Sequence, residues 1–214
     1  MKVAYLTVGP VAENTFVVIN DKADNAALLI DPGDEPESIK KALEETGADV
    51  KAILLTHTHF DHVGAVAPMA RELGVEVWVP ELERHVLADI NNFIRFPGVG
   101  PFESYEAEHT VAGGEKLELA GFEIDVYFTP GHSPGHVSYS ISDELALFSG
   151  DVLFQGSIGR TDLPGGDHQT LLDAIAMLIE TLPPQTAVFP GHMGVTTLET
   201  EAATNPFIAG QAKA

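Results

Sequence analysis

The strongest pattern in this chain of 214 residues is His57-Thr58-His59-Phe60-Asp61-His62. Alternate residues of an extended segment point the same way, so His57 and His59 can bind one ion. Asp61 and His62 come where the chain turns into the next helix, and they can face a neighbouring ion. Neutral imidazoles and a carboxylate suit zinc, iron or manganese. The stretch therefore predicts a metal site.

Five short apolar runs, one of them just before this stretch, each lead into a turn that carries a histidine or an aspartate. Such runs, closed by glycine or proline, are typical of buried strands with tight exits. Strand ends of this kind are expected to share one edge of a sheet system, where sites are usually built. The runs are 26–30, 52–55, 126–128, 145–148 and 187–189, and the turns carry Asp31, His57, His132, Asp151 and His192.

His132, Asp151 and His192 complete the candidate ligands. With the first stretch they make five histidines and two aspartates, which is enough for two sets of three if one carboxylate bridges. Ions about 3.5–4 Å apart with such a bridge are the arrangement of two-metal hydrolases. Water between them becomes a hydroxide at neutral pH and can attack a carbonyl. We expect Asp31 to hold a ligand imidazole by its other ring nitrogen; a plain turn or helix-capping aspartate is the alternative.

The remaining sequence predicts an α/β fold. Apolar residues at helical spacing predict helices over Glu37–Thr46, Val63–Leu73 and His168–Leu182. Hairpins are predicted where Lys116–Leu119 meets Phe122–Phe128 and where His136–Ser142 meets Glu144–Phe148. The less regular segment Arg84–Glu108 indicates a loop or short helices near the site, where Phe93, Phe96 and Phe102 could line a substrate wall. No linker divides the chain, so residues 1–214 are expected to form a single domain.

The charge of the chain excludes several classes of partner. The sequence has 32 acidic and 11 basic residues, a formal net charge of −21, and no cysteine. Such a surface repels phosphate backbones and anionic membranes, so no nucleic-acid or membrane partner is expected. The missing cysteine excludes disulfides and thiolate ligands. No apolar run has the length of a membrane span or the pattern of a signal peptide, which predicts a cytoplasmic protein.

The order His-x-His-x-Asp-His, then His, Asp and His, resembles the ligand set of metallo-β-lactamase-fold hydrolases. The resemblance implies a four-layer αββα sandwich with two mixed β-sheets flanked by helices. It assigns His57, His59 and His132 to one metal and Asp61, His62 and His192 to the other, with Asp151 bridging. His136, which ends Gly131-His132-Ser133-Pro134-Gly135-His136, then either supports a ligand through a hydrogen bond or is purely structural.

Within the superfamily the chain looks most like the short bacterial glyoxalase II group, the hydroxyacylglutathione hydrolases. Three signatures carry this likeness: 157–162 (Ser-Ile-Gly-Arg-Thr-Asp), 165–167 (Gly-Gly-Asp) and 204–207 (Thr-Asn-Pro-Phe). Two departures from full-length members are expected: no segment resembling their C-terminal helical domain, as in the short members, and Gly194 where they place a tyrosine. Arg160 matches a family residue that contacts substrate; an ion pair with Asp162 or Asp167 is the alternative.

The resemblance implies an enzyme with two divalent ions, zinc or otherwise iron or manganese. It would cleave a small anionic thioester, S-2-hydroxyacylglutathione, by attack of a hydroxide that bridges the metals. Asp61 would orient the hydroxide, and Arg160 would bind the acid end of the substrate. One alternative is a mono-iron glutathione persulfide dioxygenase that uses His57, His132 and Asp151. Others are a hydrolase of another small ester or lactone and a non-catalytic binding protein. A monomer or small homo-oligomer is expected.

Overall fold

The computed structural model describes residues 1–94, 96 and 98–208. Its first sheet has six strands in the order of the chain. The first three run antiparallel through short turns, whereas the last three pair in parallel, which requires longer crossovers. The strands are β1 (Lys2–Val8), β2 (Glu13–Asn20), β3 (Ala26–Ile30), β4 (Asp49–Leu54), β5 (Glu76–Pro80) and β6 (His109–Val111).

The second sheet also has six strands, in the order β14-β13-β10-β9-β8-β7. Among the described strands of this sheet, only β10 and β13 pair in parallel. The chain between them contains the helix α5 (His168–Thr181). The strands are β7 (Lys116–Leu119), β8 (Phe122–Phe128), β9 (Val137–Ile141), β10 (Ala146–Gly150), β13 (Ala187–Pro190) and β14 (Thr196–Thr197). A small separate ribbon joins β11 (Leu153–Phe154) to β12 (Ser157–Ile158).

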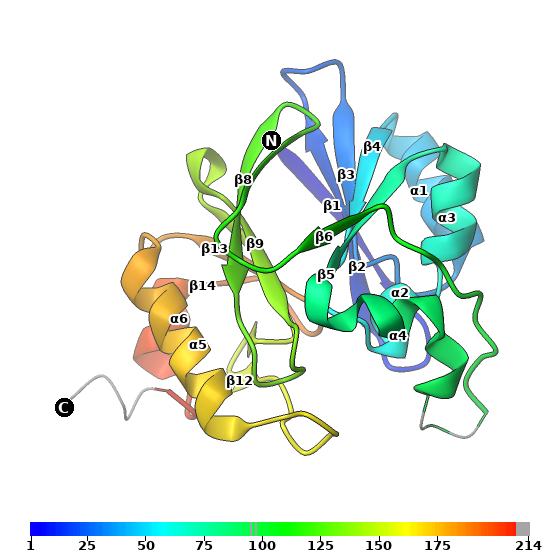
Figure 1. Ribbon diagram of the computed structural model, residues 1–214. Helices are drawn as coiled ribbons and strands as arrows, with labels where there is room; N and C mark the ends of the chain where they lie inside the picture. The colour runs from blue at the N-terminus through cyan, green and yellow to red at the C-terminus, as the bar shows by residue number, and fades with distance from the viewer. Residues whose placement is uncertain (95, 97, 209–214) are drawn as a thin grey trace.

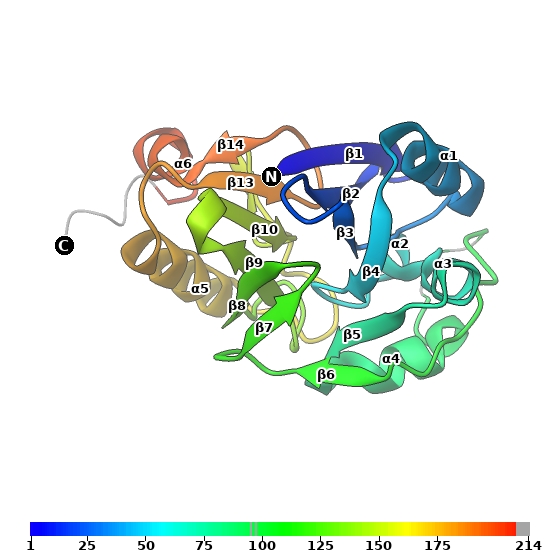
Figure 2. The same cartoon turned by 90° about the horizontal axis from the view of Figure 1, so that it is seen from above.

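Helices cover the outer face of each sheet, and the two sheets face each other (Figures 1 and 2). The first sheet carries α1 (Pro36–Thr46), α3 (Val66–Leu73) and α4 (Arg84–Ala88); the second carries α5 (His168–Thr181) and α6 (Leu198–Thr204). Phe16, Leu28, Tyr139 and Phe148 belong to the apolar core between the sheets. Two further cores lie between each sheet and its helices. The predicted four-layer αββα sandwich of two mixed sheets is confirmed.

The helix boundaries follow from local chemistry. α1 starts with Pro36 at its first turn and ends at Gly47, whose φ of 65° suits a residue without a side chain. α5 starts at Asp167, whose carboxylate accepts the N–H of Thr170 at 2.8 Å, and Pro183 follows its end. Both helices match their predicted ranges within one residue.

The predicted helix over Val63–Leu73 is wrong at its start. The structure has a short α2 (Phe60–Val63), then a break at Gly64 and Ala65, and only then α3. The N–H of Ala65 donates to the carbonyl of Pro32 at 3.0 Å, so this loop takes a bond that a continuous helix would use. The break lets the segment after His62 pack against the turn that carries Asp31.

The irregular segment after β5 contains short helices, as expected. Within the predicted range Arg84–Glu108 these are α4 and the 3₁₀ turn η2 (Ile90–Asn92), and residues 95 and 97 of the range lie outside the described part. The 3₁₀ turn η1 (Glu81–Glu83) precedes α4, and η3 (Ser142–Glu144) joins β9 to β10. Within the described ranges, no helix combines the length and apolar character needed to cross a membrane. The single domain over 1–214 stays a prediction, and its residues 209–214 lie outside the described part.

Candidate metal centre

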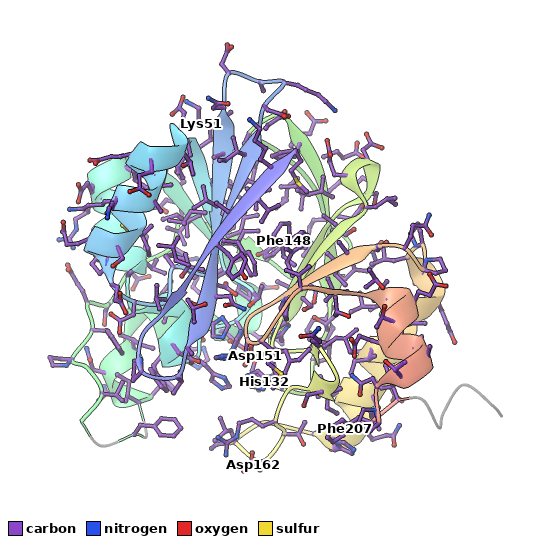
Figure 3. All side chains as sticks on the ribbon, turned by 180° about the vertical axis from the view of Figure 1, so that it is seen from behind. Lys51, His132, Phe148, Asp151, Asp162 and Phe207 are labelled. Carbon is purple, nitrogen blue, oxygen red and sulfur yellow. The ribbon has the colours of Figure 1, made fainter. Side chains whose placement is uncertain are left out.

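The candidate ligands lie together at one end of the sandwich. They follow the carboxyl ends of β4, β8, β10 and β13, which belong to both sheets. Figure 3 shows Asp151 and His132 at this end, with Lys51 at the opposite end and Phe148 between the sheets. The shared edge that the apolar runs predicted is therefore present.

The first ligand group consists of His57, His59 and His132. His57 and His59 follow β4 of the first sheet, and His132 follows β8 of the second. Their ligand atoms all lie within 4.8 Å of one another. His59 Nδ1 and His132 Nε2 are 2.8 Å apart. His57 is wholly buried, and its Nε2 atom has no hydrogen-bond partner. Three imidazole nitrogens at this spacing can bind one ion.

The second ligand group consists of Asp61, His62 and His192, whose ligand atoms also lie within 4.8 Å of one another. Asp61 and His62 lie in α2, after β4 of the first sheet, and His192 follows β13 of the second. Asp61 Oδ2 is 3.3 Å from His192 Nε2 and 3.9 Å from His62 Nε2. His62 Nε2 is buried and has no hydrogen-bond partner. This group offers one carboxylate and two imidazoles to an ion.

Asp151 lies between the two groups. Its Oδ2 atom is 3.4 Å from His132 Nε2 of the first group and 3.5 Å from His192 Nε2 of the second. Its Oδ1 atom is 3.3 Å from His62 Nε2, yet these two atoms lack the geometry of a hydrogen bond. A carboxylate placed in this way can be shared by two ions.

The unpaired atoms fit metal ligation. His57 Nε2, His62 Nε2 and Asp151 Oδ1 are all buried without a hydrogen-bond partner. Leaving a buried polar atom unpaired costs about 1–3 kcal/mol, so three such atoms at one place call for a partner. Imidazole nitrogens and a carboxylate oxygen are the donors that zinc, iron and manganese accept. The residues present therefore fit two divalent ions.

Asp31 lies behind the second group, on the far side of the His62 ring. Its Oδ2 atom is 3.0 Å from His62 Nδ1. The same carboxylate accepts the N–H of Thr56 at 2.7 Å and the Thr56 hydroxyl at 2.6 Å. A carboxylate on Nδ1 fixes the proton there and leaves Nε2 free to bind an ion. Asp31, His57 and His62 also form a close group, but Asp31 uses both of its oxygens in these contacts.

His136 lies beside the ligands without joining either group. Its Nε2 atom accepts the backbone N–H of Asp151 at 3.0 Å, and its Nδ1 atom is 3.0 Å from the Thr129 hydroxyl. The ring stacks on His57 at a centroid distance of 4.9 Å. Both ring nitrogens are thus engaged, and the residue supports Asp151 through its backbone.

The electrostatics differ between the two groups. Burial lowers the pKa of His57 well below its usual range, and burial together with His132 lowers the pKa of His59 to about 4. In the second group, burial alone would lower the pKa of His62, but the charges of Asp151 and Asp61 raise it well above its usual range. The lowered pKa values favour neutral imidazoles at His57 and His59, the form that binds a metal ion. In the second group, an ion would replace the positive charge that a proton places on His62.

Comparison with known proteins identifies the family. The family model of the metallo-beta-lactamase superfamily matches residues 8–192. The chain belongs to this superfamily. A probable metallo-hydrolase of Bacillus subtilis, YqgX, is 40% identical over 98% of this chain and 99% of its own length. The hydroxyacylglutathione hydrolase GloC of Haemophilus influenzae is 34% identical over 97% of this chain and 98% of its own.

Solved structures of the superfamily show the same fold. The BLEG-1 B3 metallo-beta-lactamase has a TM-score of 0.91 at 41% identity and covers 98% of this chain and 100% of its own. TTHA1623, solved in a di-iron-bound form, has a TM-score of 0.84 at 41% identity over 95% of this chain and 99% of its own. ETHE1 from Myxococcus xanthus has a TM-score of 0.77 at 26% identity over 98% of this chain and 85% of its own.

Other residues at the superfamily site were missed in the sequence. Asn14 donates to the carbonyls of Pro190 and Met193 at 3.0 and 2.9 Å and so holds the turn that carries His192. Glu13 is wholly buried, its Oε1 atom lies 3.8 Å from His62 Nδ1, and burial raises its pKa well above the usual range. The available signal was a polar start, Glu13-Asn14-Thr15, to an otherwise apolar strand. Glu83 is a third such residue and is described below.

Arg160 does not point freely into the centre. Its guanidinium donates from Nε and Nη2 to Asp162 at 2.7 and 2.8 Å, which is the ion pair named above as the alternative. The side chain is 54% exposed. Its backbone carbonyl lies 2.8 Å from His132 Nδ1. The backbone carbonyl of Arg160 thus holds the ring of His132. The third guanidinium nitrogen, Nη1, lies on the side away from Asp162.

The other signatures of the short glyoxalase II group are structural here. Asn205 is buried, and its amide donates to the carbonyl of Ser157 at 2.9 Å and to the carboxylate of Glu201 at 2.8 Å. These bonds hold the ribbon β11–β12 against α6. Gly165 packs against Pro134, next to the loop of His132, and has a φ of 87°.

The aromatic residues of the irregular segment pack on two different side chains. Phe96 and Phe102 pack on Phe60, which lies between two candidate ligands, at centroid distances of 5.2 and 6.4 Å. Phe93 packs on His85 instead. Phe96 is 41% exposed, and a substrate wall formed by these aromatic residues stays a prediction. Like His136, the histidines His85, His109 and His168 lie outside both ligand groups.

Proposed function

We propose that this chain is a two-metal hydrolase of thioesters, with S-2-hydroxyacylglutathione as its substrate. The observation that carries the proposal is the place of Asp151, which lies within 3.5 Å of a histidine from each ligand group. A relative of the same length is named hydroxyacylglutathione hydrolase, which supports the substrate. The complete ligand set argues against a non-catalytic binding protein.

One ion would be held by His57, His59 and His132, and the other by Asp61, His62 and His192. Asp151 would contact both ions. Two bound divalent ions, zinc or otherwise iron or manganese, would supply an activated water and a Lewis acid for the thioester carbonyl. Asp61, whose carboxylate is partly exposed, would accept a hydrogen bond from the attacking water and orient it. Attack would break the carbon–sulfur bond and give a carboxylic acid and a thiol.

Arg160 would bind the carboxylate of the substrate through the side of its guanidinium that Asp162 leaves free. Arg160→Ala is expected to raise the KM for an anionic thioester about tenfold, because one charge-assisted contact is worth about 1.5 kcal/mol. The KM for a neutral thioester should stay unchanged. Steady-state kinetics with the two substrates measure this.

Arg71→Ala is the matched control for Arg160. Arg71 is 59% exposed and also pairs with a carboxylate, that of Glu103 through its Nη2 atom, but it lies on the outer helix α3. Its loss removes the same charge and should change neither KM. Equal effects of Arg160→Ala on the anionic and the neutral thioester would contradict the role in anion binding.

The proposed function is tested by metal analysis of protein purified without chelator, followed by a substrate panel. We expect about two ions per chain and the fastest turnover on an S-2-hydroxyacyl thioester. The panel includes a simple ester, a lactone and a cephalosporin, the last because a structural neighbour is named as a B3 metallo-beta-lactamase. Less than one ion per chain, or a preference for a lactone or a β-lactam, would overturn the proposal.

A mono-iron persulfide dioxygenase is the second candidate. The structural likeness to ETHE1 over 98% of this chain keeps it in view. It would use His57, His132 and Asp151, a two-histidine, one-carboxylate set. Oxygen uptake with glutathione persulfide decides between the two, since the hydrolase consumes no oxygen. Rapid uptake by protein that contains one iron would support the dioxygenase.

A further inference from the structure

Glu83 is a buried acid that none of the steps above uses. It ends η1, directly before α4, and it is only 4% exposed, whereas the two residues before it are exposed. A carboxylate taken out of water is costly unless hydrogen bonds replace its hydration. The partners of Glu83 therefore show what the acid is for.

The carboxylate of Glu83 accepts four hydrogen bonds from two loops. Its Oε2 atom accepts the backbone N–H of Thr58 at 2.7 Å and the Thr58 hydroxyl at 2.9 Å. Its Oε1 atom accepts the backbone N–H of Gly135 at 2.9 Å and the Ser133 hydroxyl. Each oxygen thus serves one loop, and one side chain links both.

These two loops carry the whole first ligand group. Thr58 stands between His57 and His59, in the loop after β4 of the first sheet. Ser133 follows His132, in the loop between β8 and β9 of the second sheet. The link is close, because a Cβ added at Gly135 would lie 2.7 Å from Glu83 Cγ. The last ligand of the second group, His192, is held by other partners, among them the carbonyl of Ala12 at 3.2 Å.

We propose that Glu83 is a positioning residue that fixes the distance between His59 and His132 and thereby sets the metal affinity of the first group. The inference rests on the ligand sets of the proposed function. Glu83 touches no ligand side chain in the contacts described, so it acts through the two loops. Supporting partners of this kind typically change metal affinity 10–100-fold when they are lost.

An amide in place of the carboxyl group cannot satisfy this arrangement. A backbone N–H faces each oxygen, and a backbone N–H cannot turn round to become an acceptor. In Glu83→Gln one oxygen becomes an NH₂ group, which then faces either the N–H of Thr58 or the N–H of Gly135. Whichever way the amide is oriented, one loop loses the hydrogen bond from its backbone N–H while the volume of the side chain is kept.

Glu201→Gln is the matched control, because Glu201 is 1% exposed and is bound in a similar way. It accepts the N–H of Gly156 and the amide of Asn205, both at 2.8 Å, and the hydroxyl of Thr196 at 2.6 Å. None of these partners belongs to a loop with a candidate ligand. A general loss of stability caused by a buried amide should therefore appear in both Glu83→Gln and Glu201→Gln. A loss of metal affinity should appear in Glu83→Gln alone.

The test measures zinc binding to metal-free protein by competition with a coloured chelator. Wild type is expected to bind two ions. His192→Ala leaves the first group intact, and there Glu83→Gln should weaken zinc binding by about 10–100-fold. His59→Ala leaves the second group intact, and there Glu83→Gln should change the affinity less than threefold. Glu201→Gln should leave both affinities unchanged.

Each of the other outcomes contradicts either the role of Glu83 or the ligand sets on which that role rests. If wild type binds two ions and Glu83→Gln changes neither affinity, or changes both equally, the role of Glu83 is wrong and the proposed function stands. If wild type binds no zinc, iron or manganese, the ligand sets are wrong and this inference falls with them. Should Glu83→Gln not fold by circular dichroism, Ser133→Ala decides: a loss of about threefold in the His192→Ala background supports the role, and unchanged affinity overturns it.

Discussion

Asp151→Asn is expected to lower thioester turnover about a thousandfold or more and to reduce the bound metal from two ions per chain to one or none. The carboxylate lies 3.3–3.5 Å from His62, His132 and His192, so it serves both ligand groups at once. Burial alone would raise the pKa of Asp151, but the charges of these histidines lower it below its usual range, so the ionised form is present. Asparagine keeps the shape and loses both the charge and one oxygen. Metal analysis and single-substrate kinetics measure the two effects.

Asp173→Asn is the control for this substitution. Asp173 is exposed on α5 and carries the same charge, but its side chain accepts a bond only from Gln169 among the described contacts. The control should retain two ions and wild-type turnover. An Asp151→Asn protein that keeps both ions and more than a tenth of wild-type turnover would show that the carboxylate does not bridge.

Gly33→Ala is expected to destabilise the fold by about 3 kcal/mol, which corresponds to a loss of roughly 10 °C in melting temperature at this chain length. The added methyl group would overlap with the carbonyl oxygen of Asp61 and with the carboxylate of Glu13. The turn cannot yield easily, since the N–H of Gly33 donates to the Thr15 hydroxyl at 3.1 Å. Any shift would move Asp61 and His62, so the metal content should fall together with the melting temperature.

Gly74→Ala separates this overlap from backbone strain. Gly74 has a φ of 66°, which disfavours alanine, but nothing lies within 4 Å of the added Cβ. Its cost should be about 1 kcal/mol, with two ions still bound. Thermal unfolding of both variants, with and without added zinc, gives the comparison. If Gly33→Ala has the same melting temperature as Gly74→Ala, the steric argument is refuted.

Much of the fold was predictable because the signals are local. Each of the five apolar runs lies within a strand of the structure, to within one residue at either end of the run, and the turns after them meet at one edge. Such runs need only their own residues to form a buried strand, and the glycines and prolines that follow fix the exits. α1 and α5 were likewise readable from apolar spacing and from their end signals.

The parts that were missed depend on contacts distant in sequence. Glu83 is one of 32 acidic residues and sits in no pattern, and its role exists only because two loops from different sheets meet it. The break at Gly64 likewise depends on Pro32, whose carbonyl takes the N–H of Ala65. Asn14 in β2 is polar because it holds the His192 turn.

Arg160 shows a different limit. Sequence left two partners open for its guanidinium, and the structure pairs it with Asp162, two residues away. The likeness to the short glyoxalase II group rests on residues that mostly hold the scaffold, such as Asn205. Such residues place the chain in a group without recognising a substrate, which is why the family was easier to predict than the substrate.

Each candidate ligand group takes two residues from one loop of the first sheet and its last histidine from the second sheet. A complete group therefore forms only where the two sheets have docked, which couples metal binding to that docking step. An ion bound by either group would tie the sheets together and slow their separation, since it stabilises only the docked state. The rate at which metal is captured during refolding would then report the docking of the two sheets, with no label on the chain.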